Sequence, residues 1–245
     1  MSDQRILFGF HAIGVRLKTA PRTIGEVHVD SARQDGRMRQ FVDRVRAAGV
    51  RVLDSDDAAL SRLAGTPRHQ GVVARAEAMP LARTVIELLD AIAGPPLLLV
   101  LDGVTDPHNL GACLRVADAA GVHGVIAPKD HAAPLNATVS KVASGAAEVV
   151  PYLMVTNLAR ALSEMRAQGV RIVGTGDDAA PSLFEADLRG PLAIVLGAED
   201  KGLRQLTRKS CDAMLRIPMQ GAVESLNVSV AAGVCLFEAV RQRGL

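Results

Sequence analysis

From residue 97 onward, short apolar runs alternate with amphipathic segments of helical periodicity. Helices are predicted between most of the runs, including residues 109–120 and 157–168. Apolar strands that alternate with helices are typical of a parallel sheet covered on both faces. This part of the chain is therefore predicted to be an α/β domain. The six predicted strands are residues 97–101, 124–127, 148–155, 170–174, 192–196 and 213–217.

The chain before residue 76 has a different rhythm, with β-rich runs at 26–29, 50–53 and 71–74. Between them, residues 37–48 predict an amphipathic helix whose apolar stripe is Met38, Phe41, Val42 and Val45. We read residues 1–75 as a small α/β domain. Residues 76–96 are a predicted linker, because a short helical segment there ends at Gly-Pro-Pro. Residues 97–245 form the larger domain.

The stretch 217–240 crosses a glycine loop and enters an apolar helix. Its residues Leu226, Val230, Val234 and Phe237 recur at helical spacing, which predicts one buried face. Ser225 and Asn227 stand where the loop turns into the helix, and both are good cap residues. A junction of this kind between a loop and a helix N-terminus, near a sheet edge, is also a favoured place to bind a polar ligand.

Composition bounds the class of protein. Hydrophobic residues make up 49% of the chain, enough for a sizeable core. The three cysteines show no paired spacing, and Cys113 and Cys235 lie in apolar helical runs where buried thiols are usual. This fits a reducing compartment, and we expect a cytoplasmic protein with no membrane partner. The histidines are scattered, so no metal site is predicted.

Charge is distributed unevenly. Residues 1–75 hold 13 lysines and arginines against 8 acidic residues, whereas residues 76–245 hold 15 against 18. A basic first part hints at a nucleic-acid partner, although ordinary variation in composition can give such an excess. With one tyrosine and no tryptophan, recognition would depend on phosphate and shape rather than on base stacking.

Three loops rich in glycine and polar residues follow predicted strands, at 102–111, 197–202 and 218–227. In a parallel sheet these loops meet at one edge, where ligands bind. Asn109 stands at a helix start, where it could simply be an N-cap, and Arg115 points away from the apolar stripe of that helix. Glu199 follows a buried strand, where a helix dipole alone would favour a carboxylate.

The segments DPHNLGACLR, LGAEDKG and IPMQGAVESLNVSVA closely resemble, in order and spacing, the three motifs of the SpoU/TrmH-type RNA 2′-O-methyltransferases of the SPOUT superfamily. FGFHAI near the start and HQGVVA at 69–74 resemble the substrate domain of that family, so the likeness covers nearly the whole chain. The resemblance is nearest to members that methylate a guanosine of bacterial 23S rRNA in the peptidyl-transferase P loop.

The resemblance implies a deep trefoil knot in residues 97–245, a homodimer formed through that domain, and S-adenosylmethionine as the cofactor. It also implies that residues 1–75 bind the RNA substrate. The positions that match the cofactor site of the family are Gly197, Ile217 and Leu226. The positions that match its catalytic constellation are Asn109, Arg115, Glu199, Ser225 and Asn227. Asp200 and Lys201 depart from what relatives often carry, which leaves the charge near the cofactor open.

The implied chemistry gives each side chain a task. A guanidinium is very hard to deprotonate, so we favour Arg115 as a clamp for RNA phosphate, while its use as a general base stays open. Asn109 and Ser225 would orient the ribose and Arg115, and Glu199 would hold Arg115 or nearby backbone donors. Two alternatives remain, namely the same reaction on tRNA and a non-catalytic RNA-binding factor in ribosome assembly. The complete set of motif residues argues against the second.

Overall fold

The computed structural model describes residues 4–77, 84–179, 181–198, 201–223 and 225–244. The chain forms two compact units, Met1–Leu81 and Ala82–Leu245, which we call unit 1 and unit 2. This division differs from the predicted boundaries at 75/76 and 96/97. Strand β4 (Val72–Glu77) continues past residue 75 because it pairs with β1 as far as Glu77. Helix α4 (Val85–Asp90), inside the predicted linker, buries Val85 and Leu88 in a core of unit 2.

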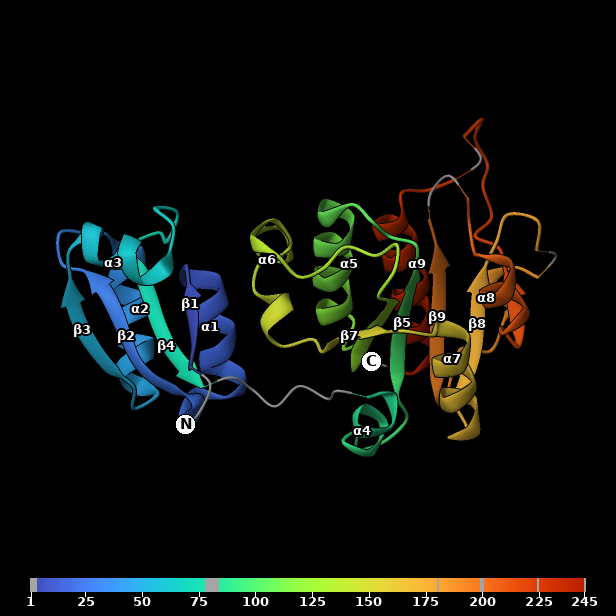
Figure 1. Ribbon diagram of the computed structural model, residues 1–245, viewed down its shortest axis with the longest axis horizontal. Coiled ribbons are helices and arrows are strands. Elements are labelled where there is room, and N and C mark those ends of the chain that lie inside the picture. The colour runs from blue at the N-terminus through green and yellow to red at the C-terminus, as the bar shows by residue number, and fades with distance from the viewer. Residues whose placement is uncertain (1–3, 78–83, 180, 199–200, 224, 245) are drawn as a thin grey trace. The chain divides into compact units, whose positions relative to one another are not determined.

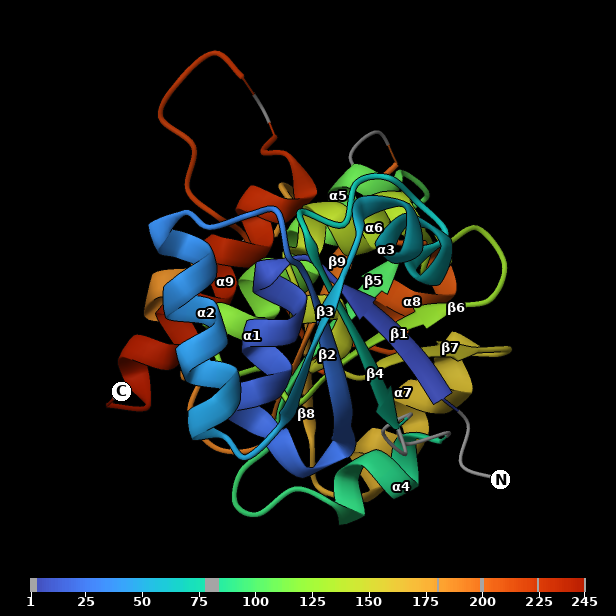
Figure 2. The same cartoon turned by 90° about the vertical axis from the view of Figure 1, so that its left-hand side faces the viewer.

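Unit 1 is a four-stranded sheet with helices (Figure 2). Its strand order is β1-β4-β2-β3, and only the β2–β3 pair is parallel. Phe10 and Phe41 meet edge to face in its core, with ring centroids 5.1 Å apart. The helical stripe predicted at 38–45 is confirmed, since Met38, Phe41 and Val45 are buried. Besides β4, its elements are β1 (Gln4–Phe8), α1 (Phe10–Thr19), η1 (Pro21–Thr23), β2 (Ile24–Asp30), α2 (Gly36–Ala47), β3 (Arg51–Ser55) and α3 (Asp57–Ala64).

Unit 2 contains a six-stranded sheet in the order β10-β8-β9-β5-β6-β7, and every pair in it is parallel (Figure 1). The predicted parallel sheet is confirmed. Its strands are β5 (Leu97–Asp102), β6 (Gly124–Pro128), β7 (Tyr152–Val155), β8 (Arg171–Thr175), β9 (Leu192–Gly197) and β10 (Ala213–Leu215). Its helices after α4 are α5 (Pro107–Ala119), α6 (Ala137–Ala143), η2 (Ala146–Glu148), α7 (Leu158–Ala167), η3 (Leu183–Glu185), α8 (Gln205–Lys209) and α9 (Val228–Gln242).

Helices cover both faces of this sheet. Along β5, Leu97, Leu99 and Leu101 join a core with α5, α6 and α9, while Leu98 and Val100 join a second core with α4 and α7. Successive strand residues point to opposite faces, so a strand buried on both sides must be apolar at every position. This explains why the strand sequences are continuous apolar runs rather than alternating ones. Among the described residues, no helix is long and apolar enough to cross a membrane.

Two sequence predictions are wrong in detail. The strand predicted at 148–155 begins only at Tyr152, because Ala146–Glu148 forms a 3-10 turn and Pro151 has no N–H for a sheet ladder. On α9, the predicted buried stripe is not the buried face. Val230 and Phe237 are 51% and 49% exposed. The buried residues of α9 are Val228, Ala232, Cys235, Leu236, Glu238 and Ala239.

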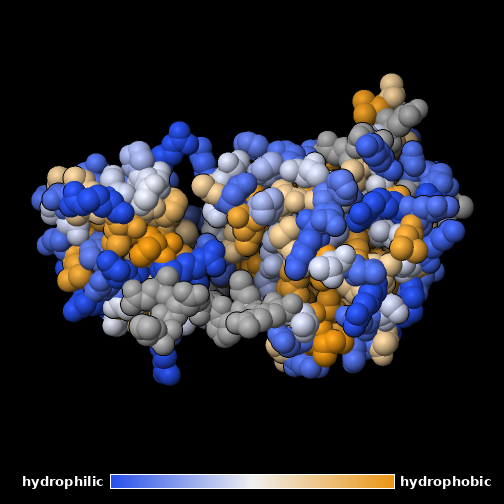
Figure 3. All heavy atoms as spheres, viewed as in Figure 1, coloured by the Kyte–Doolittle hydropathy of each residue, from blue (hydrophilic) through white to orange (hydrophobic). Residues whose placement is uncertain are grey.

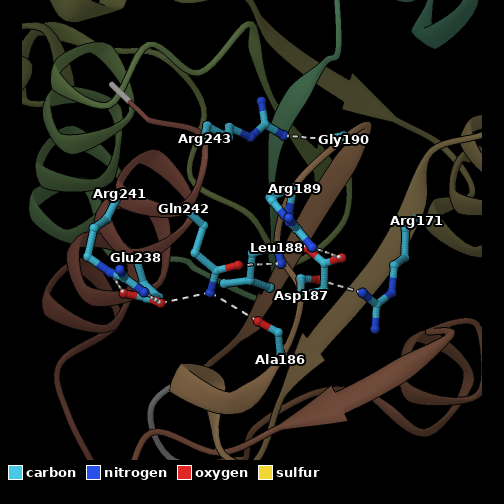
Figure 4. A network of polar contacts seen from close by, with 10 residues as sticks. All are labelled: Arg171, Ala186, Asp187, Leu188, Arg189, Gly190, Glu238, Arg241, Gln242 and Arg243. Carbon is cyan, nitrogen blue, oxygen red and sulfur yellow. Dashed lines mark hydrogen bonds and ion pairs between the residues drawn. The ribbon is translucent and has the colours of Figure 1, made fainter.

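The end of α9 is anchored to the segment that leads into β9 (Figure 4). The side chain of Gln242 accepts the N–H of Leu188 at 2.8 Å and donates to the carbonyl oxygen of Ala186 at 3.0 Å. Arg243 donates to the carbonyl oxygen of Pro96 at 3.1 Å. Hydrogen bonds from Arg241 and Gln242 lower the pKa of Glu238 to about 2. This network fixes the last turn of α9 against the sheet.

We predict that Glu238→Gln lowers the free energy of unfolding at pH 7 by up to about 1 kcal/mol, because Arg241 is well exposed and solvent screens the pair. A carboxyl whose pKa is lowered by folding stabilises above its unfolded pKa, here 4.5, and loses that contribution as pH falls toward the folded value near 2. Urea titrations from pH 7 to 3 should show the two proteins converging below pH 4.5. The variant Glu164→Gln, which breaks the ion pair between Arg160 and Glu164 on α7, serves as a control. A difference in stability between Glu238→Gln and the wild type that is unchanged at pH 3 would contradict the assignment.

Candidate active site

The carboxyl ends of β10, β8, β9 and β5 lie side by side at one edge of the sheet, since these four strands are adjacent and parallel. The loops that leave these ends span residues 103–106, 176–182, 198–204 and 216–227. They include the three loops that the sequence singled out. Ligands of open parallel sheets bind at this edge, so these loops are the place to look for a site.

An ion pair with a buried carboxylate ties the end of β5 to the loop that follows β9. Asp102, the last residue of β5, has a side chain with 0% exposure. Its Oδ2 accepts the backbone N–H of Arg204 at 3.0 Å, and its Oδ1 accepts Nε–H of the same arginine at 2.6 Å. A buried carboxylate requires such partners, because unpaired burial of a charge is costly. The contact fixes the segment after β9 across the end of β5.

Sequence reasoning did not assign a role to this pair. The available signal was an aspartate at the end of an otherwise apolar strand, LLLVLD. Its partner lies 102 residues away, and nothing in local periodicity indicates which of several basic residues would reach it.

Gly197, predicted at the cofactor site, ends β9 and opens a tight turn. Ala198 and Gly202 form an antiparallel bridge, with the N–H of Gly202 donating to the carbonyl oxygen of Ala198 at 2.8 Å. A Cβ atom added to Gly197 would lie 2.1 Å from the carbonyl carbon of Gly202, so only glycine fits there. The loop therefore folds back on the end of its own strand. Glu199 lies outside the described residues.

Two asparagines from distant motifs meet. The Nδ2 of Asn227 donates to Oδ1 of Asn109 at 2.9 Å, across 118 residues of sequence. The Oδ1 of Asn227 caps α9 by accepting the N–H of Ser229 at 2.9 Å. The N-terminal turns of α5 and α9 thus lie together, and both contribute the positive end of a helix dipole. The arrangement presents amide groups and positive potential to an oxygen-rich ligand.

The cap of α5 is not the expected residue, whereas α9 is capped by one of its two candidates. Asp106, not Asn109, caps α5, and it accepts the N–H groups of His108 and Asn109 at 3.1 and 3.2 Å. Pro107 favours the first helical position, so α5 starts two residues earlier and Asn109 sits in its first turn. Asn227 caps α9, which leaves the exposed Ser225 in the preceding loop. Asn109 therefore does not cap α5, and its side chain bonds to Asn227 at the start of α9.

Arg115 lies on the exposed side of α5 and is not brought to the asparagine pair. Arg115 stands six positions after Asn109 in the helix. This spacing corresponds to about 9 Å along the helix axis and about 120° around it. Within the described part of the chain, no hydrogen bond or ion pair engages its guanidinium. It is therefore available to an external anion.

The loop between β10 and α9 exposes apolar side chains. Ile217 is half-buried against the core, and Leu226 is half-buried near the start of α9. Met219 and Val223 are 37% and 67% exposed, and apolar atoms gather at the tip of this loop (Figure 3). A loop that carries exposed apolar residues beside polar helix ends suits a ligand with both apolar and polar parts.

A hollow of about 520 Å³ opens at the opposite, amino edge of the sheet and is lined partly by Leu97, His123 and Arg243. Most of its polar side chains already form hydrogen bonds. Arg243 and Gln242 donate to backbone carbonyl oxygens there, as part of the anchor of α9. We therefore assign this hollow to the anchor and the candidate site to the carboxyl edge.

Comparison with known proteins follows the same division of the chain. The SpoU rRNA Methylase family matches residues 96–237, and the family of RNA 2′-O ribose methyltransferase substrate binding domains matches residues 6–81. A Ralstonia nicotianae protein named 23S rRNA (guanosine-2′-O-)-methyltransferase RlmB is 60% identical over 245 residues, covering 100% of this chain and 98% of the relative. A Burkholderia protein of the same name is 57% identical, and the match covers 99% of this chain and 98% of the relative.

The fold has a close counterpart among solved structures. The SpoU methyltransferase AviRb from Streptomyces viridochromogenes, solved in complex with the cofactor AdoMet, gives a TM-score of 0.74. The two chains are 27% identical, and the match covers 98% of this chain and 90% of that one.

We predict that Arg204→Ala lowers the free energy of unfolding by about 1–3 kcal/mol, because it removes the charged partner of the buried Asp102 carboxylate, while solvent screens the half-exposed guanidinium. Adding Asp102→Asn should recover part of this loss, since the neutral amide costs less to bury. Urea denaturation of the wild type, both single variants and the double variant measures the coupling. Strictly additive losses would show that the pair does not act as a unit.

Proposed function

This chain belongs to the SpoU rRNA Methylase family, and we propose that it transfers a methyl group from S-adenosylmethionine to the ribose 2′-oxygen of a guanosine in 23S rRNA. The observation that carries the proposal is the 60% identity, over the whole chain, to a relative named for that reaction. We further propose that the guanosine lies in the peptidyl-transferase P loop and that the enzyme works in the cytoplasm, where ribosomal RNA is assembled.

The loops at the carboxyl edge suit S-adenosylmethionine. Ile217 and Leu226 would contact its apolar adenosyl part. The turn that follows Gly197 would bring backbone groups close to its polar atoms. The exposed apolar residues Met219 and Val223 stand on the same loop and gain burial if a ligand covers them. When bound, the cofactor supplies an electrophilic methyl group on a sulfonium.

The task of the protein is then to hold the ribose. Asn109 and Asn227, already joined by a hydrogen bond, offer amide donors and acceptors that can orient a hydroxyl. Correct orientation alone can supply up to roughly 7–11 kcal/mol of barrier reduction. A neutral amide cannot take up the proton that the 2′-oxygen releases, so the asparagines position the ribose rather than act as the base. Ser225, exposed two residues before Asn227, would add a further hydroxyl contact.

Arg115 would bind an RNA phosphate. Its exposed guanidinium has no ion pair with a described residue. The guanidinium group is in general very hard to deprotonate, so arginine suits an anion clamp better than a base. We keep the proposal that Glu199 holds Arg115 or nearby backbone donors in place. The trefoil knot in residues 97–245 remains a prediction of the resemblance.

The reaction is tested by incubating the purified protein with methyl-labelled cofactor and either 23S rRNA or tRNA, followed by mapping of the labelled nucleotide. One guanosine of 23S rRNA labelled at its 2′-oxygen is the expected result. Labelling of tRNA alone would move the activity to the tRNA class, and no labelling of either RNA would contradict the proposal.

Arg115→Ala should retain cofactor binding and lose about a hundredfold in kcat/KM, or about 2.7 kcal/mol of transition-state stabilisation. The reason is that Arg115 contacts RNA rather than cofactor. Calorimetric titration with S-adenosylmethionine and a turnover assay measure the two effects. Arg160→Ala, on the exposed side of α7, is the matched control and should be neutral. Wild-type turnover of the Arg115 variant would remove it from the site.

We also propose a homodimer formed through unit 2. Val230 and Phe237 lie seven residues apart on α9, so they share one face, and both are about half exposed. Burying a large apolar side chain completely contributes about 1.5–3 kcal/mol, and a second copy of this face would provide that burial. The periodic stripe read from the sequence would then be buried between chains rather than within one.

Phe237→Glu should shift the protein from dimer to monomer in sedimentation velocity, because a charge would be buried at the interface. Leu206→Glu is the matched control, since Leu206 is 64% exposed on α8 of the same unit. A wild-type protein that sediments as a monomer, or a Phe237 variant that remains a dimer, would contradict this interface.

A further inference from the structure

Helix α2 of unit 1 concentrates positive charge. Its twelve residues include four arginines and a single acidic residue, Asp43. Every one of these charged residues is exposed. The arginines are Arg37, Arg39, Arg44 and Arg46.

These four guanidiniums are not neutralised by the protein. Within the described ranges, none of them forms a hydrogen bond or an ion pair, even though Asp43 stands four residues after Arg39. The arginines of unit 2 behave differently, because most pair with a carboxylate. Those that do so are Arg160, Arg166, Arg189, Arg204, Arg208 and Arg241. The positive potential of α2 therefore extends into solvent.

Two of the arginines are held in place by aromatic rings. The guanidinium carbon of Arg37 lies 4.5 Å from the ring centroid of Phe10, and that of Arg44 lies 5.9 Å from the centroid of Phe41. Arg33, just before the helix, lies 4.9 Å from the Phe10 ring. Stacking engages the flat face of a guanidinium and leaves its N–H edge open to acceptors. Side chains held in this way lose less entropy when they bind a ligand.

The placement of Arg37 is poor for helix stability alone. It stands in the first turn of α2, where the helix dipole favours acidic residues, and that turn contains none. Arg37 and Arg44 are seven residues apart, as are Arg39 and Arg46, which places each pair on one side of the helix about 10 Å apart. Two such rows suit an extended polyanion rather than a single small anion.

We infer that α2 is the surface of unit 1 that binds rRNA, through contacts of its four arginines with the phosphate backbone (Figure 2). The inference rests on the proposed function, since it takes the substrate to be rRNA. Unit 1 matches the substrate-binding family of RNA 2′-O ribose methyltransferases, which makes RNA the natural polyanion. The chain has one tyrosine and no tryptophan, so phosphate contacts rather than base stacking carry the affinity.

The test compares the full-length wild type with a variant in which Arg37, Arg39, Arg44 and Arg46 are all changed to Gln. Binding to a 23S rRNA fragment that contains the mapped target should weaken at least tenfold at 100 mM salt. The slope of log K against log salt should fall by about 3, because each lost phosphate contact removes about 0.7–0.9. Titration with S-adenosylmethionine should give the wild-type affinity.

Two further variants make the result specific. Changing the same four residues to Lys should keep the salt slope, because the charge remains. A control with four exposed arginines elsewhere changed to Gln should bind rRNA like the wild type; its positions are Arg22, Arg62, Arg160 and Arg189. Equal losses in the control and in the α2 variant would show a general charge effect and overturn the assignment.

The outcome separates this inference from the proposed function. If the wild type neither binds nor methylates rRNA, the proposed function fails. If the wild type methylates rRNA and the α2 Gln variant binds and methylates equally well, the reaction stands and α2 is not the RNA-binding surface.

Discussion

The full-length parallel pairing of β5 with β9 is the constraint on which the rest of unit 2 depends. It sets Asp102 beside Gly197 at the same edge of the sheet, although 95 residues separate them. From that position the carboxylate of Asp102 reaches Arg204 and fixes the loop that Gly197 opens. The pairing also places α5 and α9 on the same face, where Asn109 and Asn227 meet. The proposed chemistry thus follows from a sheet that aligns three motifs far apart in sequence.

Unit 2 and helix α2 of unit 1 handle charge in opposite ways. In unit 2, arginines are mostly paired with carboxylates and serve as structural ties, as Arg204 does with Asp102. In unit 1, the arginines of α2 form no ion pair with a described residue, and two of them lie against aromatic rings. Paired charges contribute to a fixed geometry, which methyl transfer requires. Unpaired charges create a positive electrostatic potential that attracts a long polyanion. This attraction weakens as the salt concentration rises. This division matches a catalytic unit joined to a substrate-binding unit.

The fold was largely predictable because its signals are local. Continuous apolar runs such as LLLVLD predict buried parallel strands, and the observed sheet contains all six of them. The failures came where local signals were ambiguous. On α9 nearly every position is apolar, so periodicity could not choose between the stripe of Val230 and Phe237 and the stripe that is actually buried. At α5, Pro107 allowed an earlier start, which gave the cap to Asp106.

The sequence by itself determined the parallel α/β class, the three loops at the carboxyl edge and, through motif resemblance, the family. These depend on residue type and short spacing, which a single sequence displays directly. Only the tertiary structure decided that Asn227 bonds to Asn109, that Asp102 pairs with Arg204, and that the arginines of α2 have no carboxylate partner among the described residues. The physical reason is that such contacts join groups about a hundred residues apart, or require that no carboxylate comes near. Both conditions are set by how the chain packs in three dimensions.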